Sequence, residues 1–458
     1  MRDVLSALLG KAVRAVARLR GGGSALPGLV VEKVDPGFMA RALGGLPLGV
    51  VVVSGTNGKT TTTKMIVEIL EQLGVKVFTN RTGSNFSRGI VAAIVQECSL
   101  RGRLDADVAV LELDEAHAMY FIDRVPPRHT LLLNVLRDQL DRFGEIDTTA
   151  RLLQRIADAT TEGVVVNRED RLVAAIGERT RERAADLPAE AHPPLEVREF
   201  GLSDELLSTF PSDDDFHAAT LQRSAPEREL PREADVTLVA VGDHRAVFRI
   251  DGREYETALK LEGLYNTFNA AAALSLVRMI ARGSETAEVC PDCLRIEAPT
   301  ERLLSALAEV RPAFGRGERL TLDGQPLDLV LVKNPAGFRL GLASFDPSGV
   351  DVMIAINDQY ADGRDMSWLW DVDFTSLAEG GVDTVSGTRA WDMALRLEHD
   401  EVPVGHVEED LGRALAGFRR RTAPEGGAVR PRRIYCTYTA MLGLRRALAE
   451  LTEVEDVW

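Results

Sequence analysis

Short β-branched runs alternate with helical patterns along residues 46 to 175. The apolar runs are VVVV, VKVFT, VAVLEL, TLLLNV and VVVN. After the first run, apolar residues recur at the spacing of one helix face, at Met65, Ile66, Ile69, Leu70 and Leu73. Continuously apolar strands are typical of parallel sheets, because helices cover such sheets on both faces. The pattern therefore predicts an α/β domain with a mainly parallel sheet.

The pattern changes after this region. Residues 201 to 233 are polar and acidic without a sustained period, which predicts an exposed insertion or mobile loop. DVTLVAV, RAVFRID and REYETALKL then predict antiparallel strands, with turns at Gly242-Asp243 and Asp251-Gly252. A helix follows at about 266 to 281. We place a domain boundary near Gln325, at the end of a central domain over residues 46 to 325. A second, smaller Rossmann-like α/β domain is predicted over 326 to 458 from the strand patterns LDLVLVK, VMIAIN, TVSG and RRIYC.

The N-terminal 45 residues predict an amphipathic helix and a linker. Apolar residues fall at helical spacing, with Lys11, Arg14 and Arg18 on a neighbouring face. Such a helix either packs on its own domain or lies on an anionic membrane surface, and the first alternative is favoured. The glycine-rich stretch over residues 21 to 28, GGGSALPG, predicts a flexible connector.

Composition narrows the function classes. The 458 residues carry a net charge of -16, which argues against a broad nucleic-acid surface. Four cysteines do not make a disulfide framework, so the expected compartment is the reducing cytoplasm. The sequence contains no run of eighteen apolar residues, so it predicts no transmembrane segment.

The stretch SGTNGKTTTTK, from Ser54 to Lys64, joins the first apolar run to the first helix. Backbone N–H groups at such a strand-to-helix turn bind phosphates, and a lysine and a hydroxyl at its end serve the terminal phosphates and Mg²⁺. Lys59 and Thr60 take these two roles here. A turn that binds no nucleotide is the less favoured alternative. The residues assigned to the nucleotide are Gly55, Thr56, Asn57, Gly58, Lys59, Thr60 and Thr61.

Further polar residues follow later strands and open a helix. Glu112 ends VAVLEL, where its carboxylate could complete a magnesium shell or simply be solvated. The motif NVLRDQLDRFGEID places Arg137, Asp138 and Asp141 after the next strand. Asn266 and Asn269 are one helical turn apart and could bind a purine or ribose, although Asn266 could equally cap its helix.

These motifs, in this order, resemble the Mur ligase family, the ATP-dependent peptidoglycan and folylpolyglutamate ligases. The resemblance covers residues 46 to 325. It implies that ATP, with Mg²⁺ held by Thr60 and Glu112, phosphorylates a carboxylate to an acyl phosphate that an amine attacks. Lys59 and Glu112 would be catalytic, and we also assign Arg316 to the nucleotide.

Departures from the family's motifs limit the resemblance to some members of the family. Gln139 stands where amino-acid-adding members have a histidine, Tyr265 replaces a second histidine, and no lysine lies between Arg142 and Glu162. The C-terminal stretches LVKNPAGF, INDQYADGRDMSWLWDVDF, VSGTRAWDMALRL and YCTYTAML resemble the C-terminal domain of MurT proteins, the synthetase subunits of lipid II isoglutaminyl synthase.

This second resemblance implies amidation of the α-carboxylate of D-glutamate in the lipid II stem peptide, giving D-isoglutamine. Ammonia would come from a GatD-like glutaminase in a heterodimer, and Asp365 would complete that partner's Cys-His triad. Asp362 and Asp371 lie close in sequence, and any of the three could instead cap a helix near Met366. The lipid substrate implies a place at the inner face of the membrane.

Two other functions stay open. One is a Mur-type ligase that adds an amino acid to a peptidoglycan precursor or folate, and the other is a scaffold that binds ATP without catalysis. A glutaminase within the chain is disfavoured, because Cys98 and Cys436 have no local histidine. We expect no zinc site, since Cys290 and Cys293 form the only C-x-x-C pair and a closed site needs four ligands.

Overall fold

The computed structural model describes most of the chain and divides it into two compact units. The first unit holds the described residues up to Arg311, and the second holds those from Arg316 onward together with Leu136, Leu264 and Tyr265. The described residues are 2–19, 26–80, 87–136, 146–186, 195–207, 234–242, 244–260, 264–286, 295–311, 316–343, 348–363, 365–423 and 430–454.

The first unit is built on a nine-stranded sheet of order β2-β3-β1-β4-β5-β6-β7-β8-β9. Neighbours from β2 to β7 pair in parallel, whereas β8 pairs antiparallel with both β7 and β9. Both the parallel series and the antiparallel strands are therefore confirmed. The strands are β1 (Val50–Ser54), β2 (Val77–Thr79), β3 (Val108–Glu112), β4 (His129–Leu132), β5 (Gly163–Asn167), β6 (Glu196–Leu202), β7 (Val236–Gly242), β8 (Arg245–Ile250) and β9 (Arg253–Ala258).

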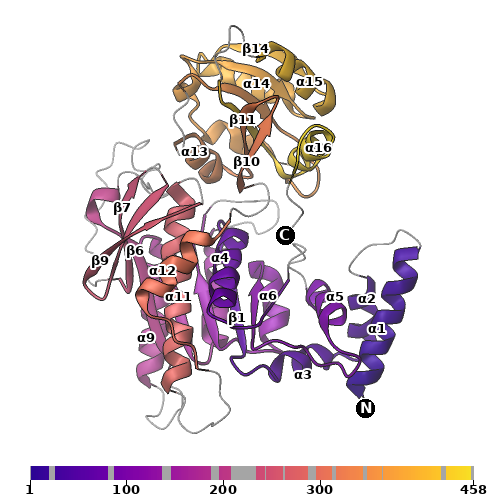
Figure 1. Cartoon of the computed structure of the whole chain (residues 1–458), viewed down its shortest axis with the longest axis vertical. Helices are drawn as coiled ribbons and strands as arrows, with labels where there is room; N and C mark the ends of the chain where they lie inside the picture. The colour runs from indigo at the N-terminus through magenta and orange to yellow at the C-terminus, as the bar shows by residue number, and fades with distance from the viewer. Residues whose placement is uncertain are drawn as a thin grey trace. The chain divides into compact units, whose positions relative to one another are not determined.

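Helices cover this sheet. In Figure 1, α4 lies in front of β1, and it packs against both β1 and β3, while α9 packs against β5 and β6. The helices are α1 (Arg2–Leu19), α2 (Leu26–Val34), α3 (Phe38–Gly44), α4 (Lys59–Gln72), α5 (Ser87–Glu97), α6 (Glu115–Ile122), α8 (Ile146–Ala159), α9 (Arg171–Asp186), the 3₁₀ turn η1 (Asp204–Leu206), α11 (Leu264–Thr286) and α12 (Thr300–Glu309).

Two predicted irregular segments are partly regular. The connector predicted over residues 21 to 28 is wrong for its last three residues, because α2 begins at Leu26 and has Pro27 in its first turn, where proline is tolerated. A Cβ on Gly28 would lie 1.9 Å from the carbonyl oxygen of Arg88, so glycine lets α2 approach α5 closely. The acidic insertion was predicted to begin at residue 201, but residues 201 and 202 belong to β6, which runs to Leu202. Residues 208–233 lie outside the described residues.

The second unit holds a six-stranded sheet of order β10-β11-β15-β12-β13-β14. Only β10 runs antiparallel to its neighbour, β11. The boundary predicted near Gln325 would separate β10 from β11. These two strands form one hairpin, so the second unit begins before both of them. The strands are β10 (Arg316–Leu322), β11 (Gln325–Leu331), β12 (Asp351–Ala355), β13 (Val382–Ser386), β14 (Val404–Glu408) and β15 (Arg432–Cys436).

Both faces of the second sheet are buried. Along β12, Val352 and Ile354 belong to one apolar cluster, whereas Met353 and Ala355 belong to another. Successive strand residues point to opposite faces, so a continuously apolar strand fills two cores. The helices are α13 (Pro335–Ala343), α14 (Ala390–His399), α15 (Leu411–Arg421) and α16 (Tyr438–Ala449), with 3₁₀ turns η2 (Ser367–Asp371) and η3 (Thr375–Leu377). No helix within the described ranges is long and apolar enough to span a bilayer.

His129, the first residue of β4, makes the stability of the chain depend on pH. Burial, with a smaller contribution from the Arg128 charge, lowers its pKa from 6.5 to about 4. The unfolded chain therefore takes up this proton at a higher pH than the folded chain does. Stability is fully present above the unfolded pKa and is lost as pH falls from about 6.5 toward about 4.

We expect His129→Phe to remove this loss. Between pH 7 and pH 5, the free energy of unfolding should fall by about 2 kcal/mol less in the variant than in the parent chain. Urea unfolding at the two pH values measures the difference. Equal pH dependence in both chains would refute the assignment.

Candidate active site

The loop between β1 and α4 is held in a shape that glycine favours. Gly55 has φ 134° and Gly58 has φ 86°, both in a region that other residues rarely adopt. A Cβ on Gly55 would lie 2.9 Å from the backbone nitrogen of Asn134, and a Cβ on Gly58 would lie 2.8 Å from Oδ1 of Asn269. The loop therefore fits closely between the segment after β4 and helix α11.

Asn134 fixes the loop with three hydrogen bonds. Its Oδ1 accepts from the backbone N–H of Asn57 at 2.8 Å, its Nδ2 donates to the carbonyl of Asn57 at 3.0 Å, and its own carbonyl accepts from Thr56 N–H at 3.0 Å. Sequence reasoning missed this role. The available signal was its place as the first residue of the NVLRDQLD motif.

Lys59 begins α4 and lies over the loop. Its Nζ donates to the carbonyls of Gly55 and Thr56, the second at 3.3 Å, and lies 3.6 Å from Oε1 of Glu115. Both side chains of this ion pair are largely buried, and Glu115 Oε1 accepts no hydrogen bond from the part of the chain that the structure describes. Glu115 was not predicted, although it is the third acid of the ELDEA stretch. The pair holds an ammonium group at the loop, where a phosphate would be bound.

Thr60 and Glu112 are brought together from two elements. Glu112 ends β3 and pairs in register with Val53 of β1, so its side chain lies at the carboxyl edge of the sheet. Thr60 Oγ1 donates to Glu112 Oε1 at 3.0 Å. Asn80, just after β2, fixes the backbone of Glu112 with hydrogen bonds of 2.8 and 3.0 Å. A hydroxyl and a carboxylate are the oxygen ligands that Mg²⁺ takes, so this pair suits the ion.

Of the two asparagines of α11, Asn269 lies at the loop, beside Gly58. Asn266 is the third residue of α11 and is half-buried, so it does not occupy the cap position. Its contact with the nucleotide remains a prediction. Arg316 opens β10 in the second unit, and its assignment also remains a prediction. The candidate residues Arg137, Asp138, Gln139 and Asp141 lie outside the described residues, as do Cys290 and Cys293.

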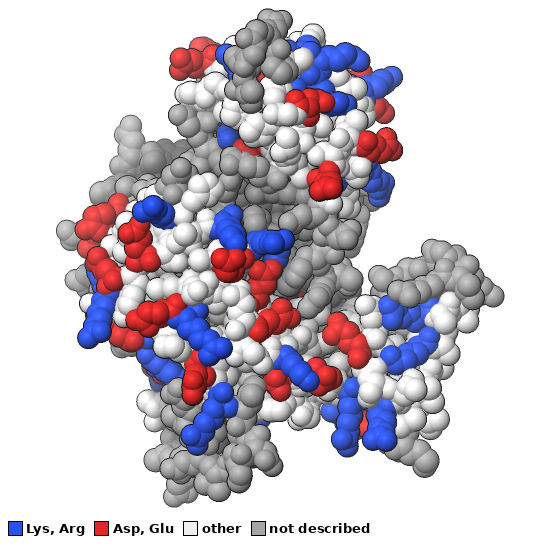
Figure 2. Space-filling model, viewed as in Figure 1, with Lys and Arg blue, Asp and Glu red and all other residues white. Residues whose placement is uncertain are grey.

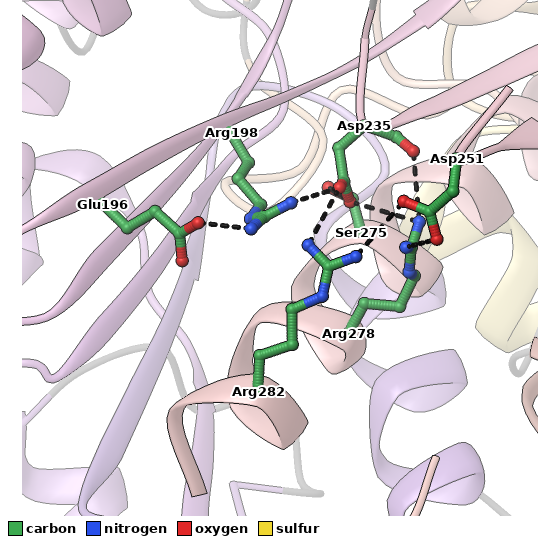
Figure 3. A network of polar contacts seen from close by, with 7 residues as sticks. All are labelled: Glu196, Arg198, Asp235, Asp251, Ser275, Arg278 and Arg282. Carbon is green, nitrogen blue, oxygen red and sulfur yellow. Dashed lines mark hydrogen bonds and ion pairs between the residues drawn. The ribbon is translucent and has the colours of Figure 1, made fainter. Parts of the chain in front are cut away.

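Helix α11 is tied to the sheet by a buried ionic network (Figure 3). Asp235, just before β7, faces Arg198 of β6 and two arginines of α11, Arg278 and Arg282. The Arg278 side chain is buried and also pairs with Asp251 at 2.5 Å. These contacts lie along the helix whose first turns carry Asn269, so the network fixes the position of that helix on the sheet.

We expect Asp235→Ala to destabilise the first unit by about 1–3 kcal/mol, because it removes the buried carboxylate that three arginines share, although Asp251 and Glu196 still pair with them. Denaturant unfolding measures the change. Glu254→Ala is the matched control, since it removes the exposed pair of Glu254 with Arg249 at 2.7 Å and should cost less than about 1 kcal/mol. Equal losses in the two variants would contradict the importance of the buried network.

In the second unit, Asp365 is exposed on the loop between β12 and η2. Its Oδ1 accepts from the backbone N–H of Ser367 at 2.9 Å, which stabilises the start of η2. Trp368 of the same motif is buried and packs against Phe338, with ring centroids 6.4 Å apart. Asp365 therefore caps a turn and remains accessible from outside, whereas Trp368 belongs to the core.

The other two acids of the motif differ from Asp365. Asp362 is buried, and it accepts hydrogen bonds from the backbone N–H of Thr439 at 2.8 Å, from the Thr439 hydroxyl and from the N–H of Gln359 at 3.1 Å. It holds the loop to the start of α16. Asp371 is exposed at the end of η2, and its carbonyl accepts from Arg339.

The two described cysteines lie in apolar surroundings. Cys98 and Cys436 are both buried, and burial raises the pKa of each thiol above its ordinary value. A nucleophilic cysteine needs a lowered pKa, since the thiolate is the reactive form. Neither thiol has the environment that a glutaminase nucleophile requires.

Comparisons with known proteins agree with this arrangement. Residues 53–277 match the Mur ligase middle domain, and residues 331–441 match the MurT ligase C-terminal family. The chain is 29% identical to the lipid II isoglutaminyl synthase (glutamine-hydrolyzing) subunit MurT of Streptococcus pneumoniae, over 98% of this chain and 97% of that protein. It is 27% identical to the MurT subunit of Staphylococcus aureus strain COL, over 90% of each.

The fold also resembles solved ligases. MurF ligase from Thermotoga maritima, in complex with ADP, superposes with a TM-score of 0.62 over 91% of this chain and 84% of that chain, at 15% identity. This likeness agrees with the α/β architecture that the sequence predicted for both units. From its phosphate-loop unit to its C-terminal unit, the chain thus belongs to the Mur ligase family of ATP-dependent ligases, in the branch that carries a MurT ligase C-terminal domain.

Proposed function

We propose that this chain is the synthetase subunit of a lipid II isoglutaminyl synthase. The observation that carries the proposal is similarity to two MurT subunits over at least nine-tenths of the chain. The hydrogen bonds of Asn57 with Asn134 and of Thr60 with Glu112 at the loop support it. The substrate is the α-carboxylate of D-glutamate in the lipid II stem peptide, and the product is D-isoglutamine. The reaction takes place where the lipid substrate resides, at the inner face of the membrane.

The chemistry has two steps. A carboxylate oxygen takes the terminal phosphoryl group of ATP, giving an acyl phosphate and ADP. Ammonia then attacks the acyl carbon, loses a proton, and displaces inorganic phosphate, leaving the amide. Lys59 and the backbone N–H groups of the loop stabilise the negative charge of the phosphates during transfer.

Mg²⁺ fits the pair of Thr60 and Glu112, whose oxygen atoms lie 3.0 Å apart. When bound, the ion neutralises phosphate charge. Asn80 keeps Glu112 in position through its backbone, and Asn134 keeps the loop in position through Thr56 and Asn57. These residues orient the reacting groups before substrate binds, which lowers the cost of reaching the transition state.

Ammonia is proposed to come from a separate GatD-like glutaminase. The buried, raised-pKa thiols of Cys98 and Cys436 support a second protein as the source. The loop around Asp365 is suited to contact such a protein, because Tyr360 on the loop and Trp370 in the adjoining η2 are exposed aromatic residues. Asp365 and Asp371 are both exposed, and the motif match favours Asp365 as the carboxylate that orients the partner's histidine, by analogy with other triads.

Mass spectrometry of lipid II tests the proposal. The chain is incubated with ATP, Mg²⁺ and lipid II, with either ammonium or glutamine plus the suspected glutaminase, and the mass change from acid to amide is read. A Mur-type ligase that adds an amino acid is the competing function. It would instead join a free amino acid to a peptidoglycan precursor or folate without any partner, and that result would replace our proposal.

A further inference from the structure

Helix α1 packs on the first unit through its small residues. Ala7 is fully buried, and a Cβ on Gly10 would lie 2.6 Å from the side chain of Val95 in α5. The same helix also contacts α2. These residues define the face of α1 that packs against the rest of the first unit.

The opposite face of α1 is apolar but exposed. Its three large side chains, Leu5, Leu8 and Val16, are 62%, 46% and 51% exposed. Ala12 and Ala15 are exposed between them. Positions 5, 8, 12, 15 and 16 recur at helical spacing, so they form one continuous stripe along the helix. A single exposed leucine is ordinary, whereas a helix-long apolar stripe indicates a surface that binds something.

The stripe lies on a basic helix in an acidic protein. Four basic residues of α1 stand against one acid, Asp3, whose carboxylate pairs with Arg41 at 2.8 Å. The whole chain carries a net charge of -16. Figure 2 shows uncharged atoms and blue Lys and Arg side chains over the part of the surface where Figure 1 places α1. The four basic residues are Arg2, Lys11, Arg14 and Arg18.

A neighbouring loop also exposes apolar and basic side chains. Gly102 packs against Asp3 in the first turn of α1, where its added Cβ would lie 2.8 Å from the backbone oxygen of Asp3. The residues beside it are the exposed Leu100 and the exposed Arg101 and Arg103. Apolar and basic side chains thus occur together both on α1 and in the segment that touches its start.

We propose that α1 lies in the interface of an anionic bilayer, with Leu5, Leu8 and Val16 turned toward the acyl chains. Basic side chains along such a helix pair with anionic headgroups, and their long stems reach the charged layer. A second copy of the chain is a poorer occupant, because pairing two such stripes would bring basic helices together. The proposal agrees with a lipid-linked substrate but rests on α1 alone.

Co-sedimentation of the full chain with lipid vesicles tests this proposal, without ATP or lipid II. We expect binding to vesicles of phosphatidylcholine mixed with phosphatidylglycerol, weaker binding to phosphatidylcholine alone, and release from the mixed vesicles at high salt. Leu5→Gln combined with Leu8→Gln should lower the partition coefficient at least about tenfold. The matched control is Leu395→Gln in α14, a leucine that is 56% exposed, and it should bind like the parent chain.

A second variant tests the charge separately. Arg2→Gln with Lys11→Gln should weaken binding to the anionic vesicles and leave binding to phosphatidylcholine unchanged. Absence of binding to anionic vesicles, or equal binding by the parent and the leucine variant, would overturn the proposal. So would a vesicle-independent dimer that the leucine variant dissociates in sedimentation velocity. Because no substrate is present, these outcomes are independent of whether the chain amidates lipid II.

Discussion

Lys59→Ala is expected to lower lipid II amidation by about 10³-fold or more, with ammonium as well as with glutamine. The amine of Lys59 lies at the phosphate loop, within 3.3 Å of the Thr56 carbonyl and 3.6 Å of the Glu115 carboxylate. Without it, the loop loses the cation that we propose stabilises the transferred phosphoryl group. The proposed acyl phosphate then forms too slowly for either ammonia source to attack. The measurements are ADP release and the mass of lipid II.

Lys76→Ala is the matched control for the loss of one lysine. Lys76 is exposed and pairs with Asp105 at 2.7 Å, away from the loop, so this variant should keep parental activity. Thermal unfolding of both variants checks that the first unit remains folded. Substantial amidation by Lys59→Ala would sink the assignment of the loop to phosphoryl transfer.

Asp365→Asn is expected to abolish glutamine-driven amidation, by about 10²–10⁴-fold, while ammonium-driven amidation stays close to parental. The variant tests charge rather than structure. Asparagine caps a helical turn about as well as aspartate, so the hydrogen bond from Ser367 N–H is retained. What is lost is the carboxylate that we propose orients the partner's histidine.

Asp373→Asn provides a closely matched control. Asp373 is also exposed, and it accepts from the N–H of Thr375 at 2.8 Å, two residues on, just as Asp365 accepts from Ser367. It should amidate normally with both ammonia sources. If Asp365→Asn instead slows the glutamine and ammonium reactions equally, Asp365 acts in the synthetase reaction or in folding, and its assignment to the glutaminase triad is wrong.

The strands that sequence predicted differ physically from those that it missed. β1, β3 and β5 are entirely buried, so each is a continuous apolar run that is visible without any structure. The missed strands β6, β10 and β14 contain charged residues. In β6, the charge at Arg198 is satisfied by Asp235, a residue far along the chain. A pattern of apolar residues alone does not reveal such a strand. The charged strands β8 and β9 were predicted because turns at Gly242-Asp243 and Asp251-Gly252 separate them from their neighbours.

The acids of the C-terminal motif show the same division. Sequence grouped Asp362, Asp365 and Asp371 but gave no reason to separate their environments. The structure buries Asp362 against Thr439 and leaves Asp365 accessible. Burial of Asp362 depends on where α16 lies, and α16 begins more than seventy residues after Asp362.

Sequence alone determined the strand, the glycine-containing loop and the helix that follows it, because all three lie in one short stretch and their conformations are local. The phosphate chemistry of that loop is our proposal. Tertiary structure decided what surrounds these elements. Four separate segments reach the loop or Glu112, the proposed magnesium ligand, through Asn80, Glu115, Asn134 and Asn269. Parallel strands bring their carboxyl ends to one edge of the sheet whatever the distance along the chain, so neighbours at that edge follow from strand order.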